Sequence, residues 1–168
     1  YYTPKPYVTL VKDVFGGVID LDPASCERAN ETVGALHYFT KDEDGLRQSW
    51  FGSVFLNPPY SQPLCSQFIS KLMDEYMANR VDQAIVLVNN ATETKHFQSL
   101  LSRYPCCFPK RRISFYHPEL GKAENNRQAQ AFFYLGDNNQ RFIEVFGRVG
   151  TVVLRVPEQV TAEARETR

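Results

Sequence analysis

Hydrophobic residues along the chain follow two spacings, one typical of helices and one typical of buried strands. Apolar positions recur every three or four residues over 7–15 and 62–79, which predicts two helices that each bury one face. Short, nearly unbroken apolar runs at 54–56 and 83–88 predict strands covered on both sides. Strands that alternate with helices in this way indicate a layered α/β fold.

The remaining segments extend the same alternation. We expect further strands over 17–22, 35–39, 112–116, 131–135 and 150–156, and further helices over 23–30, from Thr92 or Thr94 through Leu101, and over 137–146. Residues 117–130 have no periodicity and predict a loop, while the charged segment 157–168 predicts a frayed tail. No internal repeat is visible and nothing marks a second domain, so we expect a single domain over 1–156.

The tetrapeptide Asn57–Tyr60 abruptly ends the strand predicted at 54–56. Proline fixes its own φ and disfavours helical backbone in the residue before it, so Asn57 and Pro58 are both held extended. Ligands of open α/β sheets bind beyond the carboxyl ends of the strands. A stiff loop at that place, which carries one amide and one aromatic ring, is suited to hold a flat polar ring. The alternative is a proline-rich turn with no further role.

Charge is balanced overall but unevenly distributed. The chain has nineteen basic and nineteen acidic residues; residues 1–50 hold five basic and eight acidic ones, and residues 103–127 hold six basic and two acidic ones. This separation suits a cationic small molecule at one place and a polyanion at another, although two ordinary solvated surfaces would look the same. Asp22, at the end of a predicted strand, could bind such a cofactor or merely cap the helix that follows.

The cysteines and histidines form no metal-binding pattern. No Cys-x-x-Cys pair occurs, and no cysteine has a histidine at the spacing of a zinc site. The residues concerned are Cys26, Cys65, Cys106, Cys107, His37, His96 and His117. We therefore expect a reduced, intracellular protein that holds no metal and is not a metal hydrolase. Neither a signal peptide nor an apolar run of about 18 residues is present, which predicts a soluble protein, and a first residue other than Met predicts that further residues precede Tyr1.

Several short motifs accompany the tetrapeptide. They are Thr3-Pro4, Asp22-Pro23-Ala24 with Asp20 upstream, Asp44-Gly45-Leu46, the run 86–92 and the run 112–115. Together with Asn57–Tyr60, which matches the signature Asn/Asp-Pro-Pro-Tyr/Phe in full, they resemble the motifs of amino-methyltransferases that use S-adenosylmethionine. The resemblance is closest to the small phage-type, Dam-like DNA N6-adenine methyltransferases, and it extends from about Tyr2 to Leu135.

The resemblance implies a compact, trimmed, three-layer Rossmann-like methyltransferase fold of the α/β class. Its central sheet would be mainly parallel, with an antiparallel strand near the C-terminal end. We expect a monomer or weak dimer that uses S-adenosylmethionine, acts on double-stranded DNA and involves neither membrane nor metal. Its location would be the cytoplasm of a bacterium, with the gene belonging to the host or to a phage or prophage.

The resemblance also implies roles for individual residues. The implied catalytic residues are Asn57, Pro58, Pro59 and Tyr60. The implied cofactor-binding residues are Tyr2, Thr3, Pro4, Asp20, Asp22, Pro23, Asp44 and Asn57. The residues implied to contact DNA or the target base are Tyr60, Phe115, Tyr116, Lys110, Arg111, Arg112, Lys122 and Arg127.

The chemistry of an exocyclic amine explains the composition of the tetrapeptide. The lone pair of such an amine is delocalised into the ring, and two acceptors aimed at its N–H bonds would draw it out of the ring plane. The Asn57 side-chain oxygen and the Pro58 carbonyl are the implied acceptors, and proline keeps the second in a fixed position. Tyr60 would stack on a base flipped out of the duplex. Phe115, or Tyr116 if the register differs by one, would lie on the other face, although Phe115 equally fits the core.

The substrate stays open within this class. The same acceptors serve cytosine N4 or an amine in RNA, although Asn-Pro-Pro-Tyr favours adenine over Ser-Pro-Pro-Tyr variants. Ser25-Cys26-Glu27 stands where glycines are common, so a catalytically dead nucleic-acid-binding relative is a further interpretation. Asp44 by itself also fits an exposed turn. The segment 117–130 is small for target recognition and predicts a short site, for example a GATC-like one, or relaxed specificity.

Overall fold

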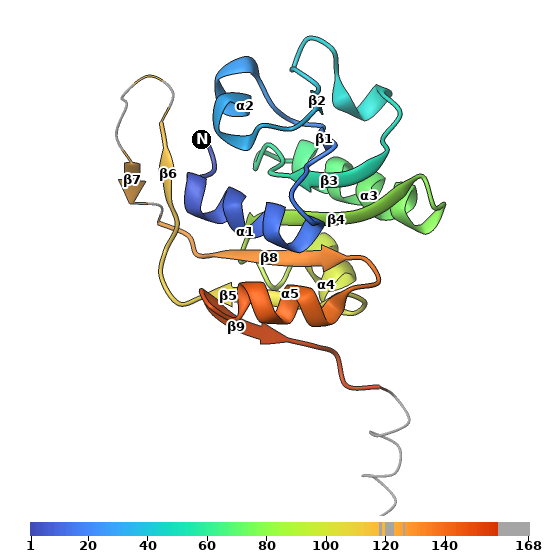
Figure 1. Cartoon of the computed structure of the whole chain (residues 1–168), viewed down its shortest axis with the longest axis vertical. Helices are drawn as coiled ribbons and strands as arrows, with labels where there is room; N and C mark the ends of the chain where they lie inside the picture. The colour runs from blue at the N-terminus through green and yellow to red at the C-terminus, as the bar shows by residue number, and fades with distance from the viewer. Residues whose placement is uncertain (118, 120–122, 126, 158–168) are drawn as a thin grey trace, which may run out of the picture.

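The computed structural model describes residues 1–117, 119, 123–125 and 127–157 (Figure 1). Within these residues the helices are α1 (Lys5–Phe15), α2 (Glu27–Val33), α3 (Leu64–Met77), α4 (Lys95–Leu101) and α5 (Asn139–Phe146), and a 3-10 turn spans Gly45–Arg47. The strands are β1 (Leu21–Asp22), β2 (His37–Tyr38), β3 (Gly52–Leu56), β4 (Val81–Asn89), β5 (Cys106–Pro109), β6 (Ser114–Tyr116), β7 (Ala123–Asn125), β8 (Gln130–Leu135) and β9 (Gly150–Val153). Apart from Pro157, the tail predicted over 157–168 lies outside the described residues.

Seven of the described strands form one sheet in the order β2-β1-β3-β4-β8-β5-β9. β1 pairs in parallel with β2 and β3, and β3 pairs in parallel with β4. β8 is antiparallel to both β4 and β5, and β5 is antiparallel to β9. Three of the pairings are thus parallel and three are antiparallel, and the expectation of a mainly parallel sheet with an antiparallel strand near the C-terminal end is not confirmed.

Helices cover both faces of this sheet, α1 and α5 on one face and α3 and α4 on the other (Figure 1). The side chains of β3 alternate between the two cores. Val54 and Leu56 lie in the core shared with α3 and α4, whereas Phe55 lies in the core shared with α1 and α5. Every residue of β8 is buried, because β8 lies between β4 and β5 and beneath helices on both faces. The predicted α/β class is confirmed.

The predicted helices are present, but α1, α2, α3 and α5 begin two to four residues from their predicted starts, and α1 and α2 show why. α1 starts at Lys5, two residues before its apolar periodicity, because the prolines at 4 and 6 suit a first helical turn. α2 starts at Glu27 and not at Pro23. The N–H of Ala24 donates to the Asp22 side chain, and Cys26 is extended with φ of −154°, so the backbone becomes helical only after Cys26.

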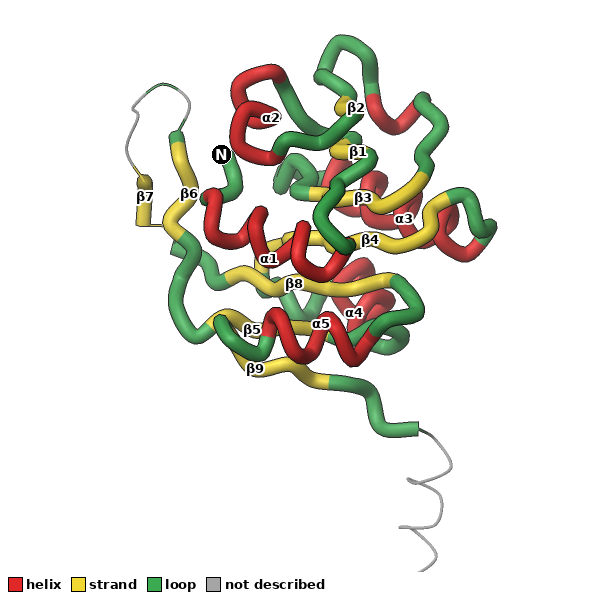
Figure 2. The backbone as a smooth tube through the Cα atoms, viewed as in Figure 1, coloured by secondary structure: helices red, strands yellow, loops and turns green. Residues whose placement is uncertain are grey.

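Two strands, β5 and β7, lie where the sequence predicts none, and β1, β2, β6 and β9 are shorter than predicted. β5 lies between β8 and β9 at a place where periodicity gives no strand, because the run has four residues and ends in proline. Cys106 and Cys107 are fully buried there and pack as small apolar residues. β7 lies within the predicted loop 117–130 and pairs with β6, so this segment forms the second half of a β-hairpin (Figure 2).

Three segments that are far apart in the sequence meet at one edge of the sheet. The parallel strands β1 and β3 pair at Leu21 and Val54, so the residues that follow both strands lie side by side. The N-terminal segment also reaches this place, since Thr3 accepts a hydrogen bond from Asn57, which follows β3, and Tyr2 forms an antiparallel bridge with Tyr116 of β6. Figure 1 shows the N-terminus beside β6.

Candidate active site

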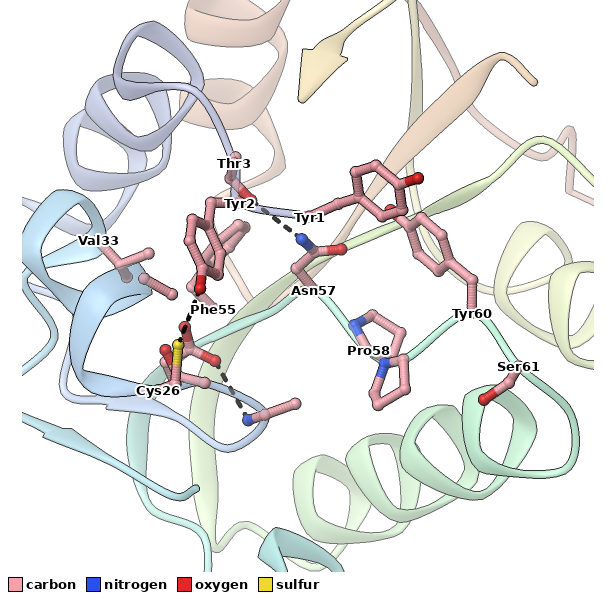
Figure 3. A pocket seen from close by; sticks show the side chains of 15 residues that line it. Tyr1, Tyr2, Thr3, Cys26, Val33, Phe55, Asn57, Pro58, Tyr60 and Ser61 are labelled. Carbon is pink, nitrogen blue, oxygen red and sulfur yellow. Dashed lines mark hydrogen bonds between the residues drawn. The ribbon is translucent and has the colours of Figure 1, made fainter. Parts of the chain in front are cut away.

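A cavity of about 460 Å³ lies at this edge of the sheet (Figure 3). Its lining comes from residues 1–3, from the end of β1 and the segment that leads into α2, and from β3 and the residues after it. The volume is within the range of small-ligand sites, about 300–1,000 Å³. Among the residues singled out in the sequence, the structure brings together here Tyr2, Thr3, Asp22, Asn57, Pro58, Pro59 and Tyr60.

Asn57 is held in place by the N-terminal segment. Its Nδ2 donates a hydrogen bond to Thr3 Oγ1 over 3.2 Å, and Thr3 is only 4% exposed. Since Thr3 engages the amide nitrogen, the amide oxygen is the atom left to accept a hydrogen bond from a ligand. In Figure 3 this oxygen points to the side of the cavity on which Tyr60 lies. Thr3 therefore orients Asn57, a contact that the sequence motifs do not reveal.

The two prolines of the tetrapeptide differ in exposure. Pro58 is buried and Pro59 is exposed. Because the ring of a proline fixes φ and removes the N–H, the backbone that carries the Pro58 carbonyl has little freedom to move. The tetrapeptide thus combines an oriented amide oxygen with a fixed carbonyl in the wall of one cavity.

Tyr60 packs against the hairpin and leaves its hydroxyl group unpaired. Its ring meets Phe115 of β6 edge to face, with ring centroids 6.4 Å apart and an interplanar angle of 78°, an arrangement that aromatic pairs favour. The hydroxyl oxygen is buried and has no hydrogen-bond partner among the described residues. Burial raises the pKa of this hydroxyl far above its usual value, so it stays protonated and can donate to a ligand.

The two aromatic residues of β6 have different surroundings. Phe115 is 1% exposed and belongs to the core beneath α1 and α5. Tyr116 is 42% exposed, and its backbone exchanges two hydrogen bonds with Tyr2, of 2.9 and 3.1 Å. Phe115 therefore supports Tyr60 from the core, whereas Tyr116 presents its ring at the surface.

Asp22 places a buried carboxyl group in the cavity wall. The residue is 3% exposed, and its Oδ1 accepts a hydrogen bond of 3.2 Å from the N–H of Ala24. Burial raises the pKa of the carboxyl to about 7, and the Ala24 N–H and the Ser25 hydroxyl offset this rise only in part. A cation in the cavity would favour the charged form. Asp22 does not cap α2, since that helix begins at Glu27.

The segment between β1 and α2 contributes residues that the sequence motifs miss. Cys26 Sγ donates to the Tyr2 hydroxyl over 3.5 Å, and this hydrogen bond, followed by burial, raises the pKa of Tyr2. The Ser25 hydroxyl oxygen is buried; it lies near enough to Asp22 to lower the pKa of that carboxyl, although no hydrogen bond of normal geometry joins it to a described residue. Ala29 and Val33 of α2 add apolar surface. The signal for Ser25 and Cys26 is their position after the first strand, where the resembling enzymes commonly have glycines.

Three other residues expected to bind a cofactor are absent from the cavity lining. The Oδ2 of Asp20 accepts a 2.7 Å hydrogen bond from the N–H of Ser53 and so joins β1 to the start of β3. The Pro23 carbonyl packs so closely on Gly45 that no side chain fits there. Pro4 precedes α1 and lines a neighbouring groove. Cofactor roles for these residues stay predictions.

Asp44 is also absent from the cavity lining. It adopts a left-handed backbone conformation, with φ of 52°, and its side chain accepts a hydrogen bond from the N–H of Leu46. Its carboxylate also lies 3.4 Å from Arg47 at the surface. These contacts fit the alternative of a turn residue, and the contact between Asp44 and a cofactor stays a prediction.

The basic residues expected to contact DNA lie at the base of the hairpin. Lys110, Arg111, Arg112 and Arg127 are all exposed. The Arg112 guanidinium donates to the Arg127 carbonyl and so joins the two ends of the hairpin. Lys122 lies outside the described residues.

Neither a metal-binding cluster nor a membrane-spanning helix occurs in the part of the chain that the structure describes. There, no three side chains of His, Cys, Asp or Glu gather in a way that could hold a metal ion, and all four cysteines are free thiols. None of the helices described combines the length and apolar character needed to cross a membrane.

Comparison with known protein families identifies a family for the chain. A family model described as DNA N-6-adenine-methyltransferase (Dam) matches residues 1–154. No curated protein and no solved structure matches the chain. The matched range includes every residue that lines the cavity.

Proposed function

Since the chain belongs to the DNA N-6-adenine-methyltransferase (Dam) family, we propose that it transfers a methyl group from S-adenosylmethionine to the N6 amine of adenine in double-stranded DNA. The observation that carries the proposal is one cavity in which Asn57, Pro58 and Tyr60 meet the buried carboxyl group of Asp22. This reaction requires two hydrogen-bond acceptors for the target amine and one acidic group for a cationic ligand.

The side chains of the cavity suit S-adenosylmethionine. Asp22 offers a carboxylate to a cationic or amino group, and the buried hydroxyl of Ser25 beside it offers a further hydrogen bond. Ala29 and Val33 offer apolar surface to the uncharged parts of the molecule. When bound, S-adenosylmethionine supplies an electrophilic methyl group on a positively charged sulfur.

Asn57 and Pro58 prepare the target amine for attack. The Asn57 oxygen and the Pro58 carbonyl each accept one N–H of the amine, which draws the nitrogen lone pair out of the ring. As the nitrogen bonds to the methyl carbon, the bond from that carbon to sulfur would break and leave a neutral thioether. Positive charge would then develop on the nitrogen, and the two fixed oxygens would stabilise it without reorganisation. No strong base is needed, because the charged product amine is acidic and can lose its proton to water.

Tyr60 binds the flipped base. Extrusion of a base from the duplex costs a few kcal/mol, and stacking on an aromatic ring offsets part of this cost. The contact with buried Phe115 fixes the ring of Tyr60 before the base arrives.

The direct test is incubation of the protein with DNA and S-adenosylmethionine carrying a labelled methyl group. We expect label in N6-methyladenine after digestion of the DNA to nucleosides. Label in N4-methylcytosine, label in RNA alone, or binding of DNA without transfer would contradict the proposal.

Replacement of Thr3 by valine is expected to lower kcat about tenfold, because the Asn57 amide loses the acceptor that orients it. Valine keeps the shape of threonine, so any fall in the affinity for S-adenosylmethionine reports the cofactor contact that the resemblance implies for Thr3. Steady-state kinetics and calorimetry measure the two quantities. Thr3→Ser is the matched control, since it keeps the acceptor oxygen, and equal kcat values for both variants would contradict the orienting role.

We also propose that residues 1–156 form one catalytic domain with a three-layer, Rossmann-like fold. The parallel order β2-β1-β3-β4 and the helices on both faces support this.

For the recognition site we propose a short sequence or relaxed specificity, because the hairpin strands β6 and β7 have only three residues each. Sequencing of DNA methylated by the protein tests this, and a site longer than about six base pairs would contradict it.

A further inference from the structure

A second groove lies directly beside the cavity. It has a volume of about 490 Å³ and runs between the start of α1, the helix α2 and the strand β6. Its lining includes the exposed cations Lys5 and Arg28, the exposed acid Glu31, and the exposed Ser114 and Tyr116 of β6. None of the sequence motifs accounts for Lys5 or Arg28.

The groove and the cavity share a wall. Tyr2 and Thr3 line both of them. Thr3 accepts the hydrogen bond from Asn57, and Tyr2 is bridged to Tyr116 through two backbone hydrogen bonds. A polymer that places one of its units beside Asn57 can therefore place a neighbouring unit in the groove.

The chemistry of the groove suits a nucleic-acid backbone. Lys5 and Arg28 provide two positive charges against the one negative charge of Glu31. The positive charge of Arg28 lowers the pKa of the Tyr2 hydroxyl, although the hydrogen bond with Cys26 and burial raise this pKa overall. Arg28 is therefore close enough to act electrostatically on the wall that the groove and the cavity share. Cations together with hydroxyl groups are the usual partners of phosphate oxygens. The exposed ring of Tyr116 adds a surface on which a sugar or base can rest.

We propose that this groove binds the sugar–phosphate backbone next to the flipped adenine, with Lys5 and Arg28 in contact with the phosphates. The inference rests on the proposed function and adds to it a place where the target strand is held. The groove positions the strand so that the flipped base enters the cavity beside Asn57.

Replacement of both cations, Lys5→Ala with Arg28→Ala, tests the inference. Both side chains are exposed, so the fold should persist. We expect the affinity for DNA to fall about tenfold, and the slope of log affinity against log salt concentration to become shallower by about 0.9 for each phosphate that the variant no longer binds. The affinity for S-adenosylmethionine, measured by calorimetry, should stay the same. Glu31→Gln should act in the opposite direction and tighten DNA binding.

The matched control is Lys95→Ala with Arg103→Ala. These two exposed residues line a separate groove of about 480 Å³ between α3 and α4, so the control removes the same charges from a groove of similar size. If both double variants show the same fall in DNA affinity and in salt dependence, the effect is one of net charge and the inference is wrong. An unchanged affinity of the Lys5/Arg28 variant for DNA also overturns the inference. If that variant still transfers methyl groups, the proposed function is unaffected. Failure of the wild-type protein to methylate DNA would instead overturn the proposed function, and with it this inference.

Discussion

Replacement of Asn57 by alanine is expected to reduce methyl transfer to DNA by about a hundredfold to a thousandfold, the range seen when one fixed group that stabilises developing charge is removed. The variant loses the side-chain oxygen that would accept an N–H of the target amine. Pro58, which supplies the other acceptor, and Asp22, which also lines the cavity, are unchanged. Transfer of labelled methyl groups into DNA measures the rate, and calorimetry should show that S-adenosylmethionine still binds.

Asn57→Asp separates the two functions of the amide. Aspartate keeps an acceptor oxygen but cannot donate to Thr3 as the Nδ2 of Asn57 does. We expect activity between that of the wild type and that of Asn57→Ala. An Asn57→Ala variant with near-normal transfer, or one that binds no S-adenosylmethionine, would show that Asn57 does not act on the target amine as proposed.

The sequence predicts the tetrapeptide of this site better than the residues that the fold brings against it. Asn57–Tyr60 is recognisable because two consecutive prolines after an apolar strand fix the backbone locally, and local constraints are visible in a sequence. The hydrogen bond between Asn57 and Thr3 joins residues 54 positions apart, and only the folding of the whole chain brings them together. The same holds for the contact between Tyr60 and Phe115.

The fold follows the same rule. Long periodic segments such as α3 and β4 are predicted within a few residues of their observed bounds. β5 is missed because four residues that include two cysteines carry little signal, and it is a strand because β8 and β9 pair with it on both sides. The start of α2 is displaced by a side-chain hydrogen bond from the Ala24 N–H to Asp22, which competes with the first helical turn.

Burial of Asp22 links the cavity to the stability of the fold. In the unfolded chain the carboxyl has its ordinary pKa of 3.8, whereas burial raises the pKa to about 7 in the folded chain. Between these two values the folded state holds a proton that the unfolded state has lost, so stability falls as the pH rises through this window. Above the upper value the cost is complete, at about 4 kcal/mol for a shift of this size.

Asp22→Asn is therefore expected to make the protein more stable and a poorer enzyme. At pH 8 the variant should exceed the wild type in free energy of unfolding by up to about 4 kcal/mol, and the difference should shrink towards pH 4, because asparagine does not ionise. Its affinity for S-adenosylmethionine should fall at least about tenfold, since the cationic ligand loses a buried charge partner.

Urea unfolding at pH 5 and pH 8 measures the first effect and calorimetry the second, with exposed Asp82→Asn on β4 as the matched control. The wild-type affinity should rise with pH through neutrality while that of the variant stays flat, because binding favours the carboxylate. If the stability of the wild type and that of Asp22→Asn depended equally on pH, Asp22 would already be ionised in the folded chain without a ligand.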